Sequence, residues 1–183
     1  MRAVLVCGLK GGVGKTHTAI NAAFALKRRG QSVGILDLDY RTPNVPVALD
    51  GGKARLSHSF EGDVLIPPVI DGIAVMSMAY IWPDWKCVEV TDQDAMEDVV
   101  NLLTPGVIDW GDIDYLVLDT PPTSVGVVTV ALGSKDVIGA LIVTHASVVA
   151  RMDTIRTLDL FRERQVPVLG MVCNQVGIHD LEI

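Results

Sequence analysis

The segment LKGGVGKTHT, Leu9 to Thr18, decides the expected fold of this chain. It follows an apolar run that suits a buried strand, residues 3–7, and it opens into an Ala-rich segment that suits a helix, residues 19–27. A strand, a glycine-rich loop and a helix in this order are the usual context of a phosphate-binding loop. The alternative, a glycine-rich turn carrying surface lysines, would require all these features to coincide by chance.

The residue types in this segment suit phosphate chemistry. Gly11, Gly12 and Gly14 let the backbone turn its amides inward, because positive φ and close approach of a phosphate are easy only without a side chain. A helix beginning near Lys15 adds the positive end of its dipole. We expect Lys15 to reach the β and γ phosphates of a nucleotide and the Thr16 hydroxyl to ligate Mg²⁺.

Two lysines give the loop a particular form. Leu9 stands where the common GxxxxGK[ST] pattern has its first glycine, and Lys10 directly precedes the paired glycines. This KGGVGKT form resembles the deviant phosphate loop of the MinD, ParA, Mrp and nitrogenase iron-protein superfamily of P-loop ATPases. The resemblance implies that Lys10 crosses a dimer interface to touch the partner's nucleotide. It also assigns nucleotide binding to the loop residues Gly11, Gly12, Val13, Gly14, Lys15, Thr16 and His17.

A pair of acids follows the next apolar run. Residues 32–38 are strand-like and deliver Asp37 and Asp39 to the edge where ligands bind in an open parallel sheet. By itself such a pair could simply end a strand at the surface. The stretch DLDYRTPNVPVAL, residues 37–49, resembles the first switch region of the Mrp branch. That resemblance implies that Asp39 orients the attacking water and that Asp37 supports the Mg²⁺ shell.

The middle of the chain carries a second stretch similar to the Mrp branch. It is LIPPVIDGIAVMSMAYIWPD, residues 65–84, in which Gly72 to Met78 is the expected strand. Residues 79–85 look exposed, and Tyr80, Trp82 and Trp85 supply aromatic area for a partner surface or for the domain's own core. Where the family has a Trp-Arg-Gly element, this chain has residues 89–91, Glu-Val-Thr. A helix is predicted over residues 91–103.

The stretch WGDIDYLVLDTPP, residues 110–122, resembles the second switch of the superfamily. Asp119 ends an apolar strand there, where a carboxylate can hold Mg²⁺ through water. Two positions depart from the family pattern. Gly126 falls where an acid is usual, and His17 where a second Ser or Thr is usual. Two expectations follow and stay open, slow hydrolysis or a different response of the switch to the γ phosphate.

The C-terminal part predicts one more helix and strand. The helix runs from a Ser147 cap to about residue 164, and its acidic and basic side chains alternate as on an ordinary solvated face. His145 has no His or Cys at metal spacing and is interpreted as structural. The final strand, residues 167–173, ends at Asn174, to which the resemblance assigns contact with the adenine base. The predicted buried stripe of the helix is Val148, Met152, Ile155, Leu158 and Phe161.

Composition narrows the class of protein. The 183 residues are 49% hydrophobic with a net charge of −7, which suits one globular domain without a broad basic nucleic-acid face. With neither a membrane-span pattern nor a signal peptide at its start, the chain is expected in the cytoplasm. Cys7, Cys87 and Cys173 follow no CxxC spacing, and the two in strand-like runs are interpreted as small core residues.

These observations predict a doubly wound α/β domain over residues 1–183, shortened at the C-terminus relative to the family. Its mainly parallel sheet holds the nucleotide at the carboxyl edge. The expected strands are residues 2–7, 32–38, 72–78, 114–119, 137–144 and 167–173.

The function favoured is an Mg²⁺-dependent ATPase that closes a symmetric homodimer on ATP. ATP is preferred to GTP because the Asn-Lys-x-Asp motif of many GTPases is missing. Three alternatives stay open. One is an iron-sulfur cluster carrier, to which the nearest resemblance points although the family's CxxC pair is lacking; Cys87 or Cys173 from two subunits could share a cluster. The others are a MinD- or ParA-like positioning ATPase and an ATP-dependent binding module with little turnover, acting on an unknown protein partner.

Overall fold

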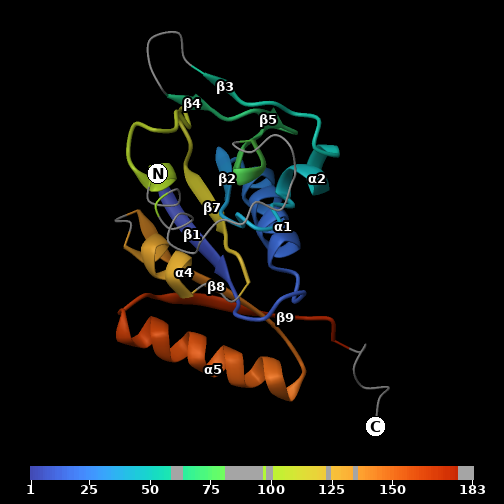
Figure 1. Ribbon diagram of the computed structural model, residues 1–183, viewed down its shortest axis with the longest axis vertical. Coiled ribbons are helices and arrows are strands. Elements are labelled where there is room, and N and C mark those ends of the chain that lie inside the picture. The colour runs from blue at the N-terminus through green and yellow to red at the C-terminus, as the bar shows by residue number, and fades with distance from the viewer. Residues whose placement is uncertain (59–63, 81–96, 98–100, 123–124, 134–135, 177–183) are drawn as a thin grey trace.

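A seven-stranded sheet forms the centre of the computed structural model, which describes residues 1–58, 64–80, 97, 101–122, 125–133 and 136–176 (Figure 1). The strand order is β5-β6-β2-β7-β1-β8-β9. The strands are β1 (Arg2–Cys7), β2 (Val33–Asp37), β5 (Val69–Ile70), β6 (Ile73–Ser77), β7 (Tyr115–Asp119), β8 (Val137–His145) and β9 (Val168–Asn174). A separate antiparallel pair is formed by β3 (Ser57–His58) and β4 (Leu65–Ile66).

All neighbouring strands from β6 to β9 are parallel, and β5 alone pairs antiparallel, with β6. The central strands are continuous apolar runs, and all five residues of β2 are buried. Runs of this kind are typical of parallel strands that are covered on both faces. Because these strands point the same way, their carboxyl ends meet at one edge, where Cys7, Asp37 and Asp119 lie.

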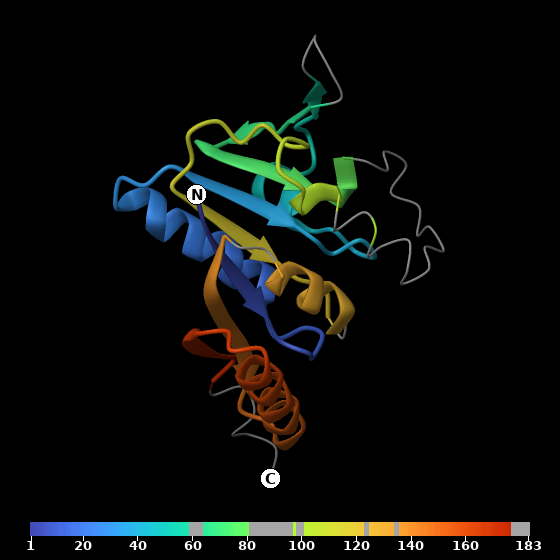
Figure 2. The same cartoon turned by 90° about the vertical axis from the view of Figure 1, so that its left-hand side faces the viewer.

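Helices cover both faces of the sheet. Helix α1 (Lys15–Arg28) packs on one face with β2 and β7, and α4 (Val125–Leu132) and α5 (Val148–Glu163) pack on the other (Figures 1 and 2). Short helix α2 (Val45–Asp50) and the 3₁₀ turn η1 (Met78–Tyr80) flank β6. In the described part of the chain no helix is long and apolar enough to cross a membrane. The fold is therefore the doubly wound α/β domain expected from the sequence.

The six expected strands are confirmed to within one residue at each end. The sequence reasoning did not identify α2, α4 or the short strands β3, β4 and β5. Of the helix predicted over residues 91–103, Glu97 and residues 101–103 are helical, and the other positions lie outside the described residues. The prediction that Ala79 is exposed was wrong, because Ala79 is 7% exposed and Tyr80 packs half-buried against the core. Trp82 and Trp85 lie outside the described residues.

The predicted buried stripe of α5 was right only toward its C-terminal end. Val148, Met152 and Ile155 are 80%, 52% and 43% exposed, whereas Phe161 is fully buried and Leu158 packs partly buried against the core. The helix also buries Ala150 and, among its polar side chains, Thr157. That residue is accommodated in the apolar contact because its hydroxyl donates to the Asp153 carbonyl. Apolar spacing alone could not reveal which side of the helix faces the sheet.

Candidate nucleotide site

The loop between β1 and α1 has the geometry that its sequence predicts. Gly14 caps α1 with φ of 91°, a left-handed conformation that favours glycine. Lys15, the first residue of α1, is 7% exposed, and its Nζ donates to the Lys10 carbonyl over 3.1 Å. The lysine therefore folds back over the loop, and its ammonium is held at the helix N-terminus.

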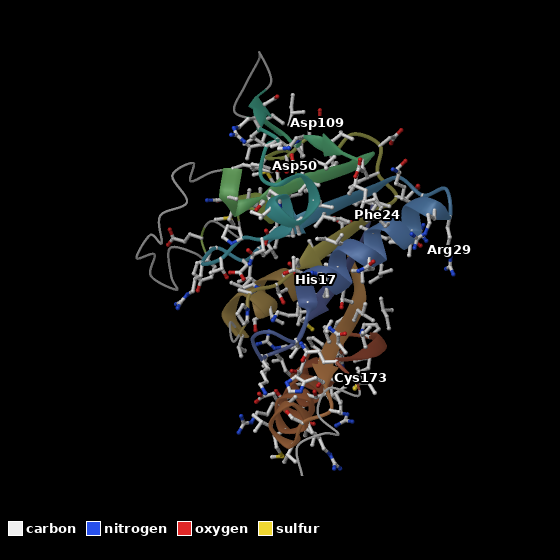
Figure 3. The ribbon with its side chains drawn as sticks, turned by 90° about the vertical axis from the view of Figure 1, so that its right-hand side faces the viewer. His17, Phe24, Arg29, Asp50, Asp109 and Cys173 are labelled. Carbon is white, nitrogen blue, oxygen red and sulfur yellow. The ribbon has the colours of Figure 1, made fainter. Side chains whose placement is uncertain are left out.

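A cavity of about 450 Å³ opens over this loop. Its floor is the loop and the first turn of α1, where Figure 3 places His17. Its wall is the segment after β2, which contributes Asp39 and Thr42, and the start of α2. Of the residues assigned from sequence, those that line the cavity are Gly12, Gly14, Lys15, Thr16, His17 and Asp39. Gly11 is exposed and Val13 is buried beneath the loop.

Two buried carboxylates lie side by side below the cavity. Asp37 and Asp119 are register partners at the ends of β2 and β7, and their residues are 0% and 1% exposed. Burial raises the pKa of Asp119 to about 7, against the opposing effects of the Thr16 hydrogen bond and the Lys15 charge. Burial lowers the pKa of Lys15, and Asp119 and Asp39 oppose that shift. The charged states of Lys15, Asp39 and Asp119 therefore depend on one another, and Thr16 stabilises the charged form of Asp119.

The Asp37 carboxylate is occupied by the chain's own donors. Its Oδ1 accepts the Asp39 amide over 3.1 Å, and its Oδ2 accepts the Val45 amide over 3.2 Å and the Ser77 hydroxyl over 3.0 Å. Burial and the neighbouring Asp119 nevertheless raise the pKa of Asp37 well above its ordinary value. Asp37 therefore ties the end of β2 to the start of α2 and to β6.

Asp39 organises the turn that follows β2. Its Oδ1 accepts the amides of Arg41 and Thr42 over 3.1 and 3.0 Å, and its Oδ2 accepts the Thr42 hydroxyl over 3.2 Å. These bonds point its carboxylate into the wall of the cavity that faces Lys15 and Thr16. A carboxylate there is placed to orient a water molecule near a bound phosphate.

The donor set fits Mg²⁺ and a nucleotide phosphate. Asp119 accepts a hydrogen bond from Thr16, and its buried Oδ1 has no hydrogen-bond partner in the described part of the chain. A hydroxyl beside a carboxylate with spare acceptor capacity is the oxygen chemistry that Mg²⁺ takes, usually with several waters retained. The glycine-rich helix start and Lys15 supply donors and positive charge for phosphate oxygens.

Asn174 contacts the phosphate loop directly. Its Nδ2 donates to the Val13 carbonyl over 3.0 Å, and the next residue, Gln175, donates to the Gly12 carbonyl over 3.0 Å. A Cβ at position 14 would lie 2.3 Å from Asn174 Nδ2, so the close contact between Asn174 and the loop requires glycine there. The end of β9 thus braces the loop. Contact of Asn174 with adenine stays a prediction, and the sequence reasoning assigned no role to Gln175.

Three more residues that the sequence reasoning did not single out belong to the surroundings of the site. Thr120 is buried and its hydroxyl donates to the Val6 carbonyl over 3.0 Å, which fixes the segment after β7 against β1. The Thr42 hydroxyl donates to Asp39, and the Ser77 hydroxyl donates to Asp37. Single hydroxyls carry little sequence signal. Gly126, at the position where the family has an acid, lies near the start of α4.

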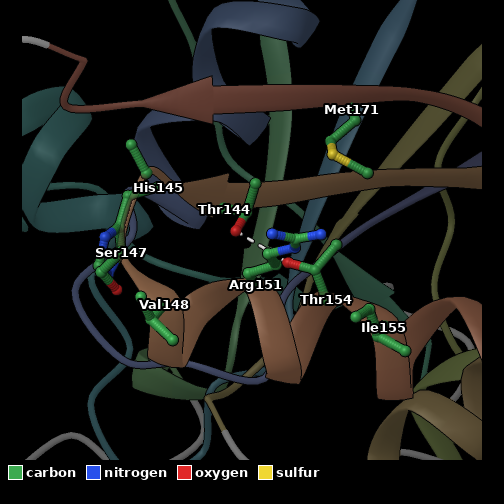
Figure 4. A pocket seen from close by; sticks show the side chains of 9 residues that line it. Thr144, His145, Ser147, Val148, Arg151, Thr154, Ile155 and Met171 are labelled. Carbon is green, nitrogen blue, oxygen red and sulfur yellow. Dashed lines mark hydrogen bonds between the residues drawn. The ribbon is translucent and has the colours of Figure 1, made fainter.

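A second cavity, of about 420 Å³, lies between the end of β8, the start of α5 and β9 (Figure 4). His145 and Arg151 line it together with exposed apolar side chains, among them Val148 and Ile155. Thr154 donates to Thr144 over 2.8 Å across it. Among the described residues no group of three or more His, Cys, Asp or Glu side chains gathers there or elsewhere as a metal site. The interpretation of His145 as structural stays a prediction.

The two described cysteines have opposite environments. Cys7 is buried in the core, and burial raises the pKa of its thiol to about 12. The prediction that Cys173 is a core residue was wrong, because it is exposed on β9, the last strand of the sheet (Figure 3). Among the described elements no strand or helix covers the outer side of β9. Cys87 lies outside the described residues.

We expect a large difference in thiol reactivity between Cys173 and Cys7. Alkylation at pH 8 requires an accessible thiolate, which the buried, high-pKa Cys7 does not supply. Iodoacetamide labelling read by peptide mass spectrometry should modify Cys173 at least about tenfold faster than Cys7. Labelling in denaturant is the control and should equalise the two. Equal rates in the folded protein would contradict the arrangement of β9 described here.

Fold and site together define a P-loop NTPase of the ParA, MinD and Mrp type. The family model described as "ParA: NUBPL iron-transfer P-loop NTPase" matches residues 1–180. The chain belongs to this family.

Curated relatives agree with that assignment. The iron-sulfur cluster carrier protein of Methanocaldococcus jannaschii is 32% identical over 177 residues, which are 95% of this chain and 60% of the relative. The iron-sulfur cluster carrier protein of Deinococcus radiodurans is 37% identical over 171 residues, which are 93% of this chain and 48% of the relative. The chain thus spans about half to three fifths of the length of these relatives.

Solved structures show the same fold. A nucleotide-binding protein from Archaeoglobus fulgidus in complex with ADP superposes with a TM-score of 0.76 at 26% identity, over 94% of this chain and 65% of that one. The MinD protein of Pyrococcus horikoshii complexed with Mg-ADP gives a TM-score of 0.70 at 19% identity, over 97% and 71% of the two chains. The second likeness concerns the fold alone.

Proposed function

We propose that this chain is an Mg²⁺-dependent ATPase whose nucleotide state controls a homodimer. The observation that carries the proposal is the convergence of Lys15, Thr16 and Asp39 on one cavity at the carboxyl edge of the sheet, with Asp119 directly below. These are the groups that bind phosphate, hold the metal and orient water in phosphoryl transfer. The ADP complex of the Archaeoglobus fulgidus relative supports nucleotide as the ligand.

Each side chain has a role in this proposal. Lys15 neutralises charge on the β and γ phosphates, Thr16 and Asp119 hold Mg²⁺ with Asp37 behind them, and Asp39 orients the attacking water. Mg²⁺, when bound, would neutralise negative charge on the phosphates. Lys10 acts on the nucleotide of the partner subunit. Asn174 braces the loop against β9 and contacts adenine.

The basic test of catalysis is release of phosphate from Mg-ATP by the purified chain. Turnover that disappears when EDTA removes Mg²⁺ supports the proposal. A rate equal to that of buffer alone would contradict it and would favour an ATP-dependent binding module.

The cargo proposed for this switch is an iron-sulfur cluster. Relatives that match nearly the whole chain at 32% and 37% identity are iron-sulfur cluster carrier proteins. We propose that two copies of the chain share the cluster, with Cys173 or Cys87 of each copy among its ligands. Cys173 is exposed on the last strand and can offer its thiolate there.

Anaerobic reconstitution with ferrous iron and sulfide tests this assignment. We expect visible charge-transfer absorption in the wild-type protein that Cys173→Ser abolishes. The buried cysteine provides the matched control, so Cys7→Ala should keep the absorption. A reconstituted protein without colour would refute the cargo, and colour that survives in Cys173→Ser would refute the role of this thiol.

A further inference from the structure

A buried hydroxyl outside the cavity reaches the acid pair from the neighbouring strand. Ser77 ends β6, is 0% exposed and lies in register with Asp37 of β2. Its Oγ donates to Asp37 Oδ2 over 3.0 Å and accepts the Ala79 amide over 3.2 Å. Ser77 is not among the described residues that line the cavity. The direct link from this hydroxyl to the site is therefore its hydrogen bond to Asp37.

Asp37 passes this constraint to the water-orienting residue. The carboxylate that accepts the Ser77 hydroxyl also accepts the amide of Asp39 and the amide of Val45, the first residue of α2. The Asp39 carboxylate is in turn held by hydrogen bonds from the amide and the hydroxyl of Thr42. A continuous series of hydrogen bonds thus runs from β6 to the wall of the cavity.

The need for this support follows from electrostatics. Asp119 is the register partner of Asp37 on β7, so two buried carboxylates lie side by side at the ends of β2 and β7. Each disfavours the charge of the other. Without the Ser77 hydroxyl, the Asp37 carboxylate would keep only the amides of Asp39 and Val45 as donors, and no donor from β6 would restrict its rotation. The Asp39 amide would then have a less firmly fixed acceptor.

We infer, on the basis of the ATPase activity proposed above, that Ser77 is a positioning residue that sets the orientation of Asp39 through Asp37. The phosphate loop does not depend on this series of bonds, because its lysine is held by Lys10 and its backbone by Asn174. Removing the Ser77 hydroxyl should therefore slow the chemical step and leave nucleotide binding nearly unchanged. Loss of a residue with only a structural role would not slow the chemical step while leaving nucleotide binding unchanged.

Kinetics of three variants test the inference. In Ser77→Ala we expect kcat to fall about tenfold, which corresponds to one hydrogen bond to a charged group, while Kd for Mg-ADP changes less than about twofold. Ser77→Thr keeps the hydroxyl and should restore most of kcat. Thr157→Val removes an equally buried hydroxyl on α5 and should match the wild type. An unchanged kcat in Ser77→Ala, or no recovery in Ser77→Thr, would overturn the inference.

Amide hydrogen exchange in the nucleotide-free protein provides a second readout that needs no turnover. In Ser77→Ala the amides of Asp39 and Val45 should exchange about tenfold faster, and that of Ala23 in α1 should not change. Unchanged exchange at Asp39 and Val45 would overturn the inference even if kcat had fallen. A wild-type protein that fails to hydrolyse ATP would refute the proposed function alone, because the exchange experiment would still decide the role of Ser77.

Discussion

Replacing Lys15 by Ala should weaken binding of Mg-ADP and Mg-ATP by about 100-fold or more. The side chain is buried at the first turn of α1, and its ammonium is directed over the phosphate loop. Truncating one member of a buried charge pair typically costs about 2–5 kcal/mol, and each 1.4 kcal/mol is about tenfold in Kd. Titration calorimetry with each nucleotide measures the effect.

Arg28→Ala is the matched control for this variant. It removes an exposed positive charge from the last turn of the same helix, far along α1 from the loop. Its affinity for nucleotide should equal that of the wild type, since exposed charges contribute little at this distance in physiological salt. Wild-type affinity in Lys15→Ala, with a melting temperature like that of Arg28→Ala, would show that nucleotide does not bind at this loop.

Replacing Asp39 by Ala should lower kcat for ATP by about 100-fold while Kd for Mg-ADP stays within about threefold. A side chain that positions or deprotonates the attacking group typically contributes about 10²–10⁴-fold in rate. Asp39 is in the wall of the cavity and not in the phosphate loop, so ground-state binding should depend on it little. Phosphate release under saturating Mg-ATP measures kcat.

Asp50→Ala is the corresponding control for Asp39. Asp50 also arranges a turn, since its carboxylate accepts the amides of Gly52, Lys53 and Ala54, but it is not among the described residues that line the cavity. Its removal should leave kcat unchanged. If Asp39→Ala hydrolysed ATP as fast as Asp50→Ala, Asp39 would have no part in orienting water.

The features that could be predicted from the sequence are those that depend on local pattern. Apolar runs that end in Asp37 and Asp119 identify parallel strands and their carboxyl edge, because parallel strands are buried on both faces. The glycines and lysines around Lys15 identify the loop, because phosphate approach restricts the residues allowed there. The sheet and the position of the candidate site followed from these two signals.

The features that could not be predicted depend on contacts between distant segments. Whether Val148 faces the sheet depends on which side of α5 packs against β8, and apolar spacing fits more than one side. Cys173 is in an apolar strand, but its exposure depends on the strand being the last in the sheet. Ser77 meets Asp37 only through the strand register. None of these contacts has a signature within its own segment.

The solution mass of the protein tests the central claim, a nucleotide-controlled dimer, most directly. Light scattering would compare the protein without nucleotide, with Mg-ADP and with a slowly hydrolysed ATP analogue. Lys10→Ala is the informative variant, because Lys10 holds Lys15 through its backbone carbonyl, which the substitution retains. We predict a mass that doubles with the analogue alone and a Lys10→Ala variant that binds the analogue but stays monomeric. A mass that does not respond to nucleotide in the wild type, while nucleotide binds, would contradict the account.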